Sequence, residues 1–183
     1  MIHHSLLNPL EKALRFYAGI YLPILFFQII GILMYVKNVW PSIKDSISTG
    51  VTFFIVLAVV LVLVRSGFWI RIYWSGANAI SILRLEGESK ELPDRLLPVL
   101  MTLKHLLVVS FILDIFFVPV IFLSDVLLPF RVSGLWLGAV YLSVIFLPQA
   151  FGIGALILAF LTHQYAQLLK ERKEMKEEIE LTT

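Results

Sequence analysis

Long runs without any charged residue are the feature that most restricts how this chain can fold. Three stretches contain no Asp, Glu, Lys or Arg: residues 16–36, 46–64 and 132–169. A fourth, residues 106–124, is interrupted only by Asp114. Lipid offers no hydrogen bonds to the backbone, so only helices of about 20 mainly apolar residues, or closed barrels, can cross a membrane. None of the four stretches alternates apolar and polar residues as a barrel strand does. We therefore predict four spanning helices.

The composition agrees with a membrane protein. Hydrophobic residues make up 59% of the chain and charged residues 15%, whereas soluble chains have roughly half and about a quarter. The predicted fold is all-α: a polytopic membrane protein forming one domain over residues 1–183, an antiparallel four-transmembrane-helix bundle with helical cytoplasmic extensions. The predicted spans are residues 16–36, 47–67, 100–123 and 135–160.

The positions of the basic residues predict the orientation. If the N-terminus lies inside, 12 of the 15 Lys and Arg residues fall on inner segments, and only Lys37, Lys44 and Arg131 fall on outer loops. Cytoplasmic loops of membrane proteins carry such an excess. We therefore expect both termini on the cytoplasmic side of the inner (plasma) membrane. Arg65 ends the second charge-free run, so its long side chain is expected to extend to the inner headgroups.

Two segments are expected to extend the bundle into the cytoplasm. In residues 68–97 apolar residues recur at helical spacing, so the second span either continues as an amphipathic helix or bends at Ser66-Gly67 and lies on the membrane surface. The tail, residues 165–183, alternates charges four residues apart and is predicted to be a solvated helix. We expect the two segments to pack together and form a partner surface. Its predicted apolar residues are Trp69, Ile72, Tyr73, Ile80, Leu83, Met175 and Ile179.

The tail also carries a family resemblance. Gln-Leu-Leu-Lys-Glu at 167–171 and Met-Lys-Glu-Glu-Ile-Glu-Leu-Thr at 175–182 resemble the ending of a bacterial four-span membrane family catalogued as domain of unknown function 2975. Members typically finish with a Leu-Lys-Glu-Glu-Asn-Asp-Leu-Thr-like string. The resemblance implies a small bacterial inner-membrane protein, in a family whose genes often lie beside a small helix-turn-helix regulator. It implies no catalytic residue.

Asp114 is the most unusual residue within a predicted span. A carboxylate at the centre of a membrane helix costs about 2.5–3.5 kcal/mol on insertion scales. Gln28 and Gln149 fall at a similar predicted depth, so the three are expected to form one polar intramembrane layer. No Lys or Arg is expected at that depth, so desolvation favours a protonated, hydrogen-bonded Asp114. The layer is then either structural or part of a transport pathway.

Two further pairs of residues suggest contacts. His105 and His163 lie toward the inner ends of their spans, and two facing histidines can ligate a haem, although histidines at helix ends are also ordinary interfacial residues. Gly134 and Gly138 form a GxxxG pattern at the outer end of the fourth span. Small residues at this spacing let helices approach closely, within the monomer or across a homo-oligomer.

The remaining motifs argue against an enzyme. The chain has no cysteine and no Gly-rich phosphate loop, HExxH or nucleophile elbow. We predict a non-enzymatic regulatory or interaction protein without a cofactor or a metal site. Its expected partners are the lipid bilayer and a cytoplasmic regulatory protein, and its net charge of +2 does not suggest direct nucleic-acid binding. The alternatives are a small transporter or proton-coupled carrier that uses Asp114, and a haem- or quinone-binding subunit.

Overall fold

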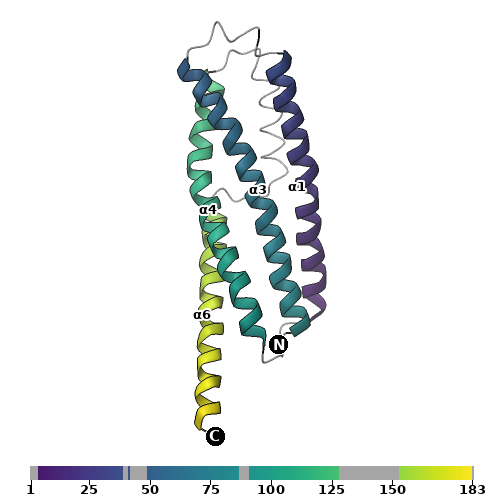
Figure 1. Cartoon of the computed structure of the whole chain (residues 1–183), viewed down its shortest axis with the longest axis vertical. Helices are drawn as coiled ribbons and strands as arrows, with labels where there is room; N and C mark the ends of the chain where they lie inside the picture. Colours follow the sequence, from purple (N-terminus) through teal and green to yellow (C-terminus); the bar gives the residue numbers. More distant parts are fainter. Residues whose placement is uncertain (1–3, 39–40, 42–48, 87–90, 128–152, 183) are drawn as a thin grey trace.

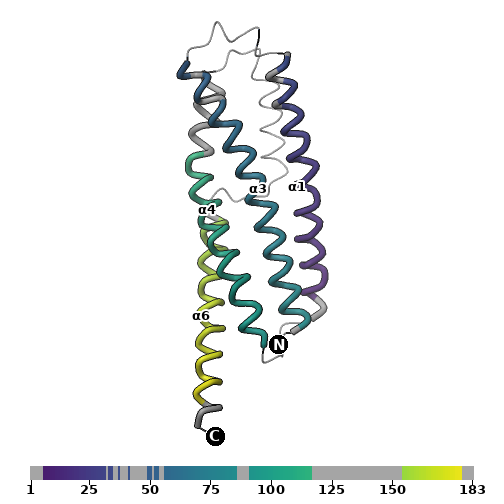
Figure 2. Tube along the Cα trace, in the orientation of Figure 1, coloured from purple at the N-terminus to yellow at the C-terminus, as the bar shows by residue number. Residues whose placement is uncertain are grey.

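The structure is a computed structural model that describes residues 4–38, 41, 49–86, 91–127 and 153–182. Figure 1 shows long helices lying side by side, and Figure 2 traces the same arrangement. No strand occurs within these ranges. The helices are α1 (His4–Asn38), α3 (Thr49–Glu86), α4 (Leu92–Leu127) and α6 (Ile153–Thr182). The predicted all-α class is therefore confirmed.

Neighbouring helices in the sequence are neighbours in space. α1 packs along α3, α3 along α4, and α4 along α6. The start of α1, the end of α3, the start of α4 and the end of α6 lie at one end of the molecule (Figure 1), which we call the terminal end. Successive helices therefore run antiparallel. At about 1.5 Å per residue each is roughly 45–57 Å long, which exceeds the ~30 Å hydrocarbon core of a bilayer.

Three of these helices are long and apolar enough to cross a membrane. The qualifying segments are Leu6–Gly31, Val56–Leu85 and Leu92–Phe116. Many large apolar side chains on them are exposed, including Phe16, Phe27 and Phe116. Soluble proteins rarely expose contiguous apolar surface on this scale, whereas a lipid-facing helix does so by necessity. Most of the predicted fourth span, together with Gln149, Gly134 and Gly138, lies outside the described residues.

The region after the second predicted span is helical without a break. α3 continues through Ser66 and Gly67 to Glu86, so the bend considered at Ser66-Gly67 does not occur. A break at this point would leave backbone groups without partners, and apolar surroundings penalise that strongly. The packing of Trp69 and Ile72 in the bundle core also holds the next turns of the helix in line.

Two clusters of buried residues hold the helices together. The central cluster joins α1, α3, α4 and α6 through Tyr21, Trp69, Ile72, Leu107, Ala155 and Ala159. The terminal cluster joins α3, α4 and α6 through Ala79, Leu92, Leu96, Leu100, Ala166 and Leu169. Small residues of α6 in both clusters let it approach the other helices closely, as in many membrane bundles.

Candidate functional site

A buried ion pair joins the middle of α3 to α4. The Arg65 Nε donates to the Asp114 Oδ1 at 2.5 Å. Both side chains are almost fully buried, at 6% and 5% exposure. An isolated charge in such surroundings is very unfavourable, and an opposite charge in contact offsets much of that penalty.

This pair corrects two expectations about Arg65 and Asp114. Arg65 does not extend toward a headgroup region, and Asp114 is not without a cationic partner. The second predicted span ends at Arg65 because a charge-free run stops at the first charged residue, so Arg65 was expected at a helix end. The pattern within one run carries no information about a partner that lies 49 positions away in the sequence.

A second polar contact extends this region to α1. The Ser66 hydroxyl donates to the Gln28 Oε1 at 3.0 Å, and both side chains are buried. Gln28, Arg65, Ser66 and Asp114 thus form a layer across three helices, which we call the polar layer. The structure places two of the three residues expected there, Gln28 and Asp114, in this layer. Gln149, the third, is outside the described residues.

The polar layer retains unused hydrogen-bonding capacity. The Gln28 Nε2, the Asp114 Oδ2 and the Ser110 Oγ are buried and have no hydrogen-bond partner among the described residues. Ser110 lies one helical turn before Asp114 on α4 and is fully buried. Buried polar atoms in native proteins normally have partners. The layer could therefore accept further contacts from a residue, a water molecule or a bound group.

A second polar network ties α1 to α3 nearer the terminal end. Arg84 pairs with the buried Glu11 at 3.2 Å and donates to the Asn8 Oδ1 at 3.1 Å. Glu11 also pairs with Arg15, whose guanidinium lies 5.3 Å from the ring centroid of Trp74. Glu11 was not among the site residues predicted from the sequence. Its spacing of four residues from Arg15 was the available signal.

The two histidines are not paired with each other in a way that supports haem ligation. The His163 Nδ1 lies 3.3 Å from the Lys104 Nζ, and His105 is exposed on α4. His163 therefore faces Lys104, the neighbour of His105. Among the described residues no group of three or more His, Cys, Asp or Glu residues could hold a metal ion.

The predicted partner surface is not built as expected. Trp69 and Ile72 are buried in the central cluster, and the ring of Tyr73 lies 5.5 Å from that of Tyr21 on α1. The tail of α6 packs mainly on the start of α4 and makes no extended contact along α3 in the described ranges. The segment after span two meets the tail only locally, where Ala79 shares the terminal cluster with Ala166 and Leu169.

On the tail, Met175 is 57% exposed, and the side chain of Ile179 is outside the described part of the chain. An exposed ion pair closes the contact between the tail and α4. The Lys173 Nζ lies 2.7 Å from the Asp94 Oδ1, and this hydrogen bond and the carboxylate charge raise the pKa of Lys173 above its usual 10.5. The raised pKa means that the charged lysine stabilises the contact at neutral pH, and that this contribution is lost as the pH rises through the higher pKa. The contact is thus independent of pH around neutrality.

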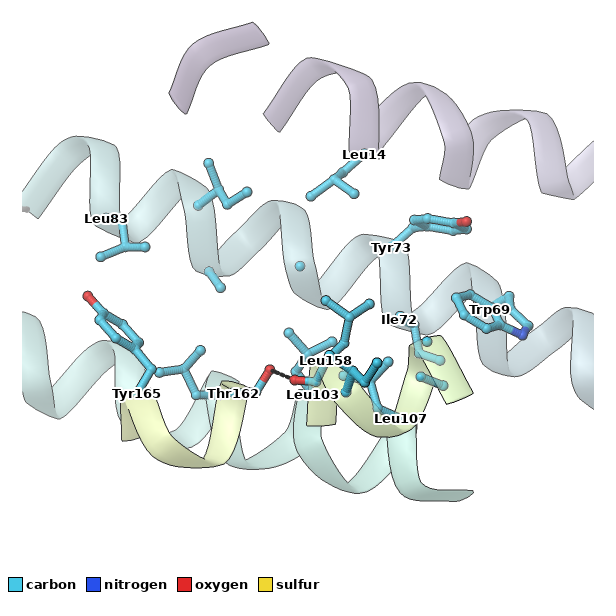
Figure 3. A pocket seen from close by; sticks show the side chains of 17 residues that line it. Leu14, Trp69, Ile72, Tyr73, Leu83, Leu103, Leu107, Leu158, Thr162 and Tyr165 are labelled. Carbon is cyan, nitrogen blue, oxygen red and sulfur yellow. Dashed lines mark hydrogen bonds between the residues drawn. The ribbon is translucent and has the colours of Figure 1, made fainter. Parts of the chain in front are cut away.

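A large apolar cavity lies between the polar layer and the terminal end. Its volume is about 580 Å³, within the range of small-molecule sites. α3, α4 and α6 supply most of the lining and α1 contributes Leu14 (Figure 3). Ile80 and Leu83, two residues expected on the partner surface, line this cavity instead. The labelled residues around it include Trp69, Tyr73, Leu103, Leu158, Thr162 and Tyr165.

Comparison with known proteins identifies no relative of this chain. The chain matches no family model, no curated protein and no solved structure.

Proposed function

We propose that the chain is a four-span inner-membrane protein with both termini in the cytoplasm, and that it acts as a non-enzymatic interaction protein. The fourth span would comprise the predicted residues 135–152 and the start of α6. The basic residues support the orientation, since most of them fall toward the terminal end or on the segments that adjoin it. The family resemblance of the tail is consistent with the same assignment.

The residues that flank the polar layer along each helix support a specific depth for this layer in the bilayer. Trp74 lies nine residues after Arg65 on α3, Lys104 lies ten residues before Asp114 on α4, and Lys37 lies nine residues after Gln28 on α1. Nine residues of helix rise about 13 Å, close to half of the ~30 Å hydrocarbon core. Residues suited to interfaces thus lie at similar distances on both sides of the polar layer. This symmetry supports a position of the layer near the bilayer centre.

The observation that carries the interaction role is the projection of α6. From His163, at the level of Lys104, the helix continues for 19 residues to Thr182, which is about 28 Å. It extends past the other helices at the terminal end (Figure 1). One side is held by Ala166, Leu169 and Lys173, while Leu168 and Met175 are 61% and 57% exposed. A fixed helix with exposed apolar residues is a suitable docking element for another protein.

Copurification from native membranes tests this role. The tagged protein is expected to retain a soluble partner that is lost when Leu168 and Met175 are both changed to Asp. Glu174→Gln, on the same exposed helix, is the matched control and should retain the partner. If the Leu168→Asp/Met175→Asp protein retains the same partner as the wild type, the projection is not the interaction surface.

One observation favours a second candidate function. The Asp114 Oδ2 and the Gln28 Nε2 are buried without partners among the described residues, as a carrier that binds a proton or a small polar solute at mid-depth would require. A carrier would show substrate or proton flux in vesicles that Asp114→Asn abolishes, even where the variant is shown to be folded, while Glu174→Gln on the exposed tail preserves it. The interaction role requires no such flux.

A further inference from the structure

The cavity between α1, α3, α4 and α6 measures about 580 Å³ and opens to the surroundings on one side. Packed helices leave few spaces of this size unfilled, so we expect it to have an occupant. We propose that it binds one acyl chain of a membrane phospholipid, which enters from the bilayer between α1 and α6. This inference rests on the membrane placement proposed above.

The chemistry of the lining suits a hydrocarbon chain. Of 17 lining residues, none is charged, and most are Leu, Ile, Ala or Gly. The Thr162 hydroxyl donates to the Leu158 carbonyl of its own helix at 2.7 Å, and the indole nitrogen of Trp69 points away from the other labelled side chains (Figure 3). A buried water needs two to four polar partners. An apolar chain needs none, so it is the better occupant.

The depth of the cavity includes that of one leaflet. Trp69, at one end, lies four residues from Arg65 of the polar layer, which is about 6 Å along α3. Leu83, at the other end, lies nine residues beyond Trp74, which is about 13 Å further along α3. The cavity thus extends from near the proposed bilayer centre to beyond the level of Trp74. An acyl chain of one leaflet, about 15 Å of hydrocarbon, would fill the inner part of that depth, with its headgroup at the outer part.

The cavity is open to the surroundings on one side. α1 packs along α3 and makes no extended contact with α6 in the described ranges. Ile157 and Leu158 line the cavity and are also 54% and 52% exposed. These two α6 residues therefore bridge the interior and the exterior surface. In a bilayer, the molecules that meet such an opening at this depth are lipid chains.

Fluorescence of Trp69 provides a direct test because this residue closes one end of the cavity and is only 6% exposed. Trp40, Trp74 and Trp136 would be changed to Phe, leaving Trp69 as the single tryptophan. The full-length protein would be reconstituted in phosphatidylethanolamine and phosphatidylglycerol vesicles with or without brominated acyl chains. Bromine quenches tryptophan at short range, so we expect a loss of Trp69 emission in the brominated vesicles. Flotation with the vesicles tests membrane insertion separately.

A pair of glycine variants locates the quenching. Gly76 lines the cavity, and a Cβ there would meet only Leu14 Cδ1, at an ordinary contact distance of 3.4 Å. Gly76→Leu should therefore fill the cavity, exclude the lipid chain and restore Trp69 emission. Gly67→Leu is the matched control on the same helix, because a Cβ there meets nothing within 4 Å, and it should leave the quenching unchanged. Unquenched Trp69 in the vesicle-inserted single-tryptophan protein would overturn the proposal and indicate that another part of the chain fills the cavity. Equal quenching in both glycine variants would also overturn it, because the quenching lipid would then lie outside the cavity.

Discussion

At the scale of single residues, the burial of Arg65 and Asp114 is explained by the ion pair that they form. Each alone would carry a charge into apolar surroundings, whereas together they satisfy one another across α3 and α4. The charge of Asp114 was visible in the sequence, and it was interpreted as a protonated acid for lack of a cation at its depth. In the structure Asp114 has a cationic partner, Arg65, that this interpretation did not include. The consequences of mutation change accordingly.

Breaking this pair should therefore be more harmful than removing it. Asp114→Asn and Asp114→Leu each remove the carboxylate that pairs with the buried Arg65, and we expect both to destabilise the protein by about 3–5 kcal/mol. The double variant Arg65→Leu/Asp114→Leu should recover most of that loss. Ser66→Ala, which removes only a neutral hydrogen bond to Gln28, should cost about 0.6 kcal/mol. Thermal unfolding in detergent measures all four. A harmless Asp114→Asn would show that the ion pair contributes little.

At the scale of helices, α6 is attached through one face and free on the other. Leu169 is 4% exposed in the terminal cluster, while its neighbour Leu168 is 61% exposed. The difference follows from the helical period, since adjacent residues point about 100° apart. The start of α4 provides the complementary surface through Leu92, Leu96 and Leu100. Tail and α4 therefore form one unit, which α3 contacts through Ala79 of the terminal cluster.

Cysteine pairs distinguish this arrangement from direct packing of the tail on α3. The chain contains no cysteine, so introduced pairs report without background. Cysteines at Asp94 and Lys173, whose side chains are in contact at 2.7 Å, should crosslink readily with a short reagent. The pair Ile80 and Met175 should not. Leu169→Lys should abolish the crosslink between positions 94 and 173 by undocking the tail, whereas Leu168→Lys should leave this crosslink intact. Efficient crosslinking of Ile80 to Met175 would instead place the tail against α3.

At the scale of the whole molecule, the proposed depth of the polar layer implies a different position of α3 in the bilayer from the one predicted from the sequence. The charge-free run predicted a span at residues 47–67. Arg65 lies level with Gln28 and Asp114, so a polar layer at the bilayer centre would put the spanning part near residues 56–74 instead. The apolar segment Val56–Leu85 is compatible with this shift. Arg71 then lies within a few residues of the headgroups, which its side chain can reach.

Labelling of single cysteines with a membrane-impermeant maleimide tests both the shift and the orientation. A cysteine at Gly50 should react in intact cells, because the shifted span leaves it outside the membrane. A cysteine at Leu85 should react only after permeabilisation, and one at Arg71 should be protected in both cases. A span at 47–67 predicts the reverse for two positions, with Gly50 protected and Arg71 labelled after permeabilisation. Labelling of Leu85 in intact cells would overturn the orientation.

The sequence by itself determined the secondary structure and the membrane character of this protein. Runs of apolar residues without charge force helices wherever lipid replaces water, so the all-α class followed from local composition. The helical tail was likewise predicted from charges spaced four residues apart, because that periodicity is a local property.

Only the tertiary structure decided which residues share a level and which faces are buried. The pairing of Arg65 with Asp114, the burial of Trp69 and Ile72, and the docking of the tail on α4 all depend on contacts between residues far apart in the chain. The apolar residues that recur at helical spacing in α3 can be buried at a membrane surface, against a partner or in the bundle interior. Their pattern is the same in all three cases. The position of the neighbouring helices selects the bundle interior. The cavity arises for the same reason, because it is a space between helices and no single segment encodes it.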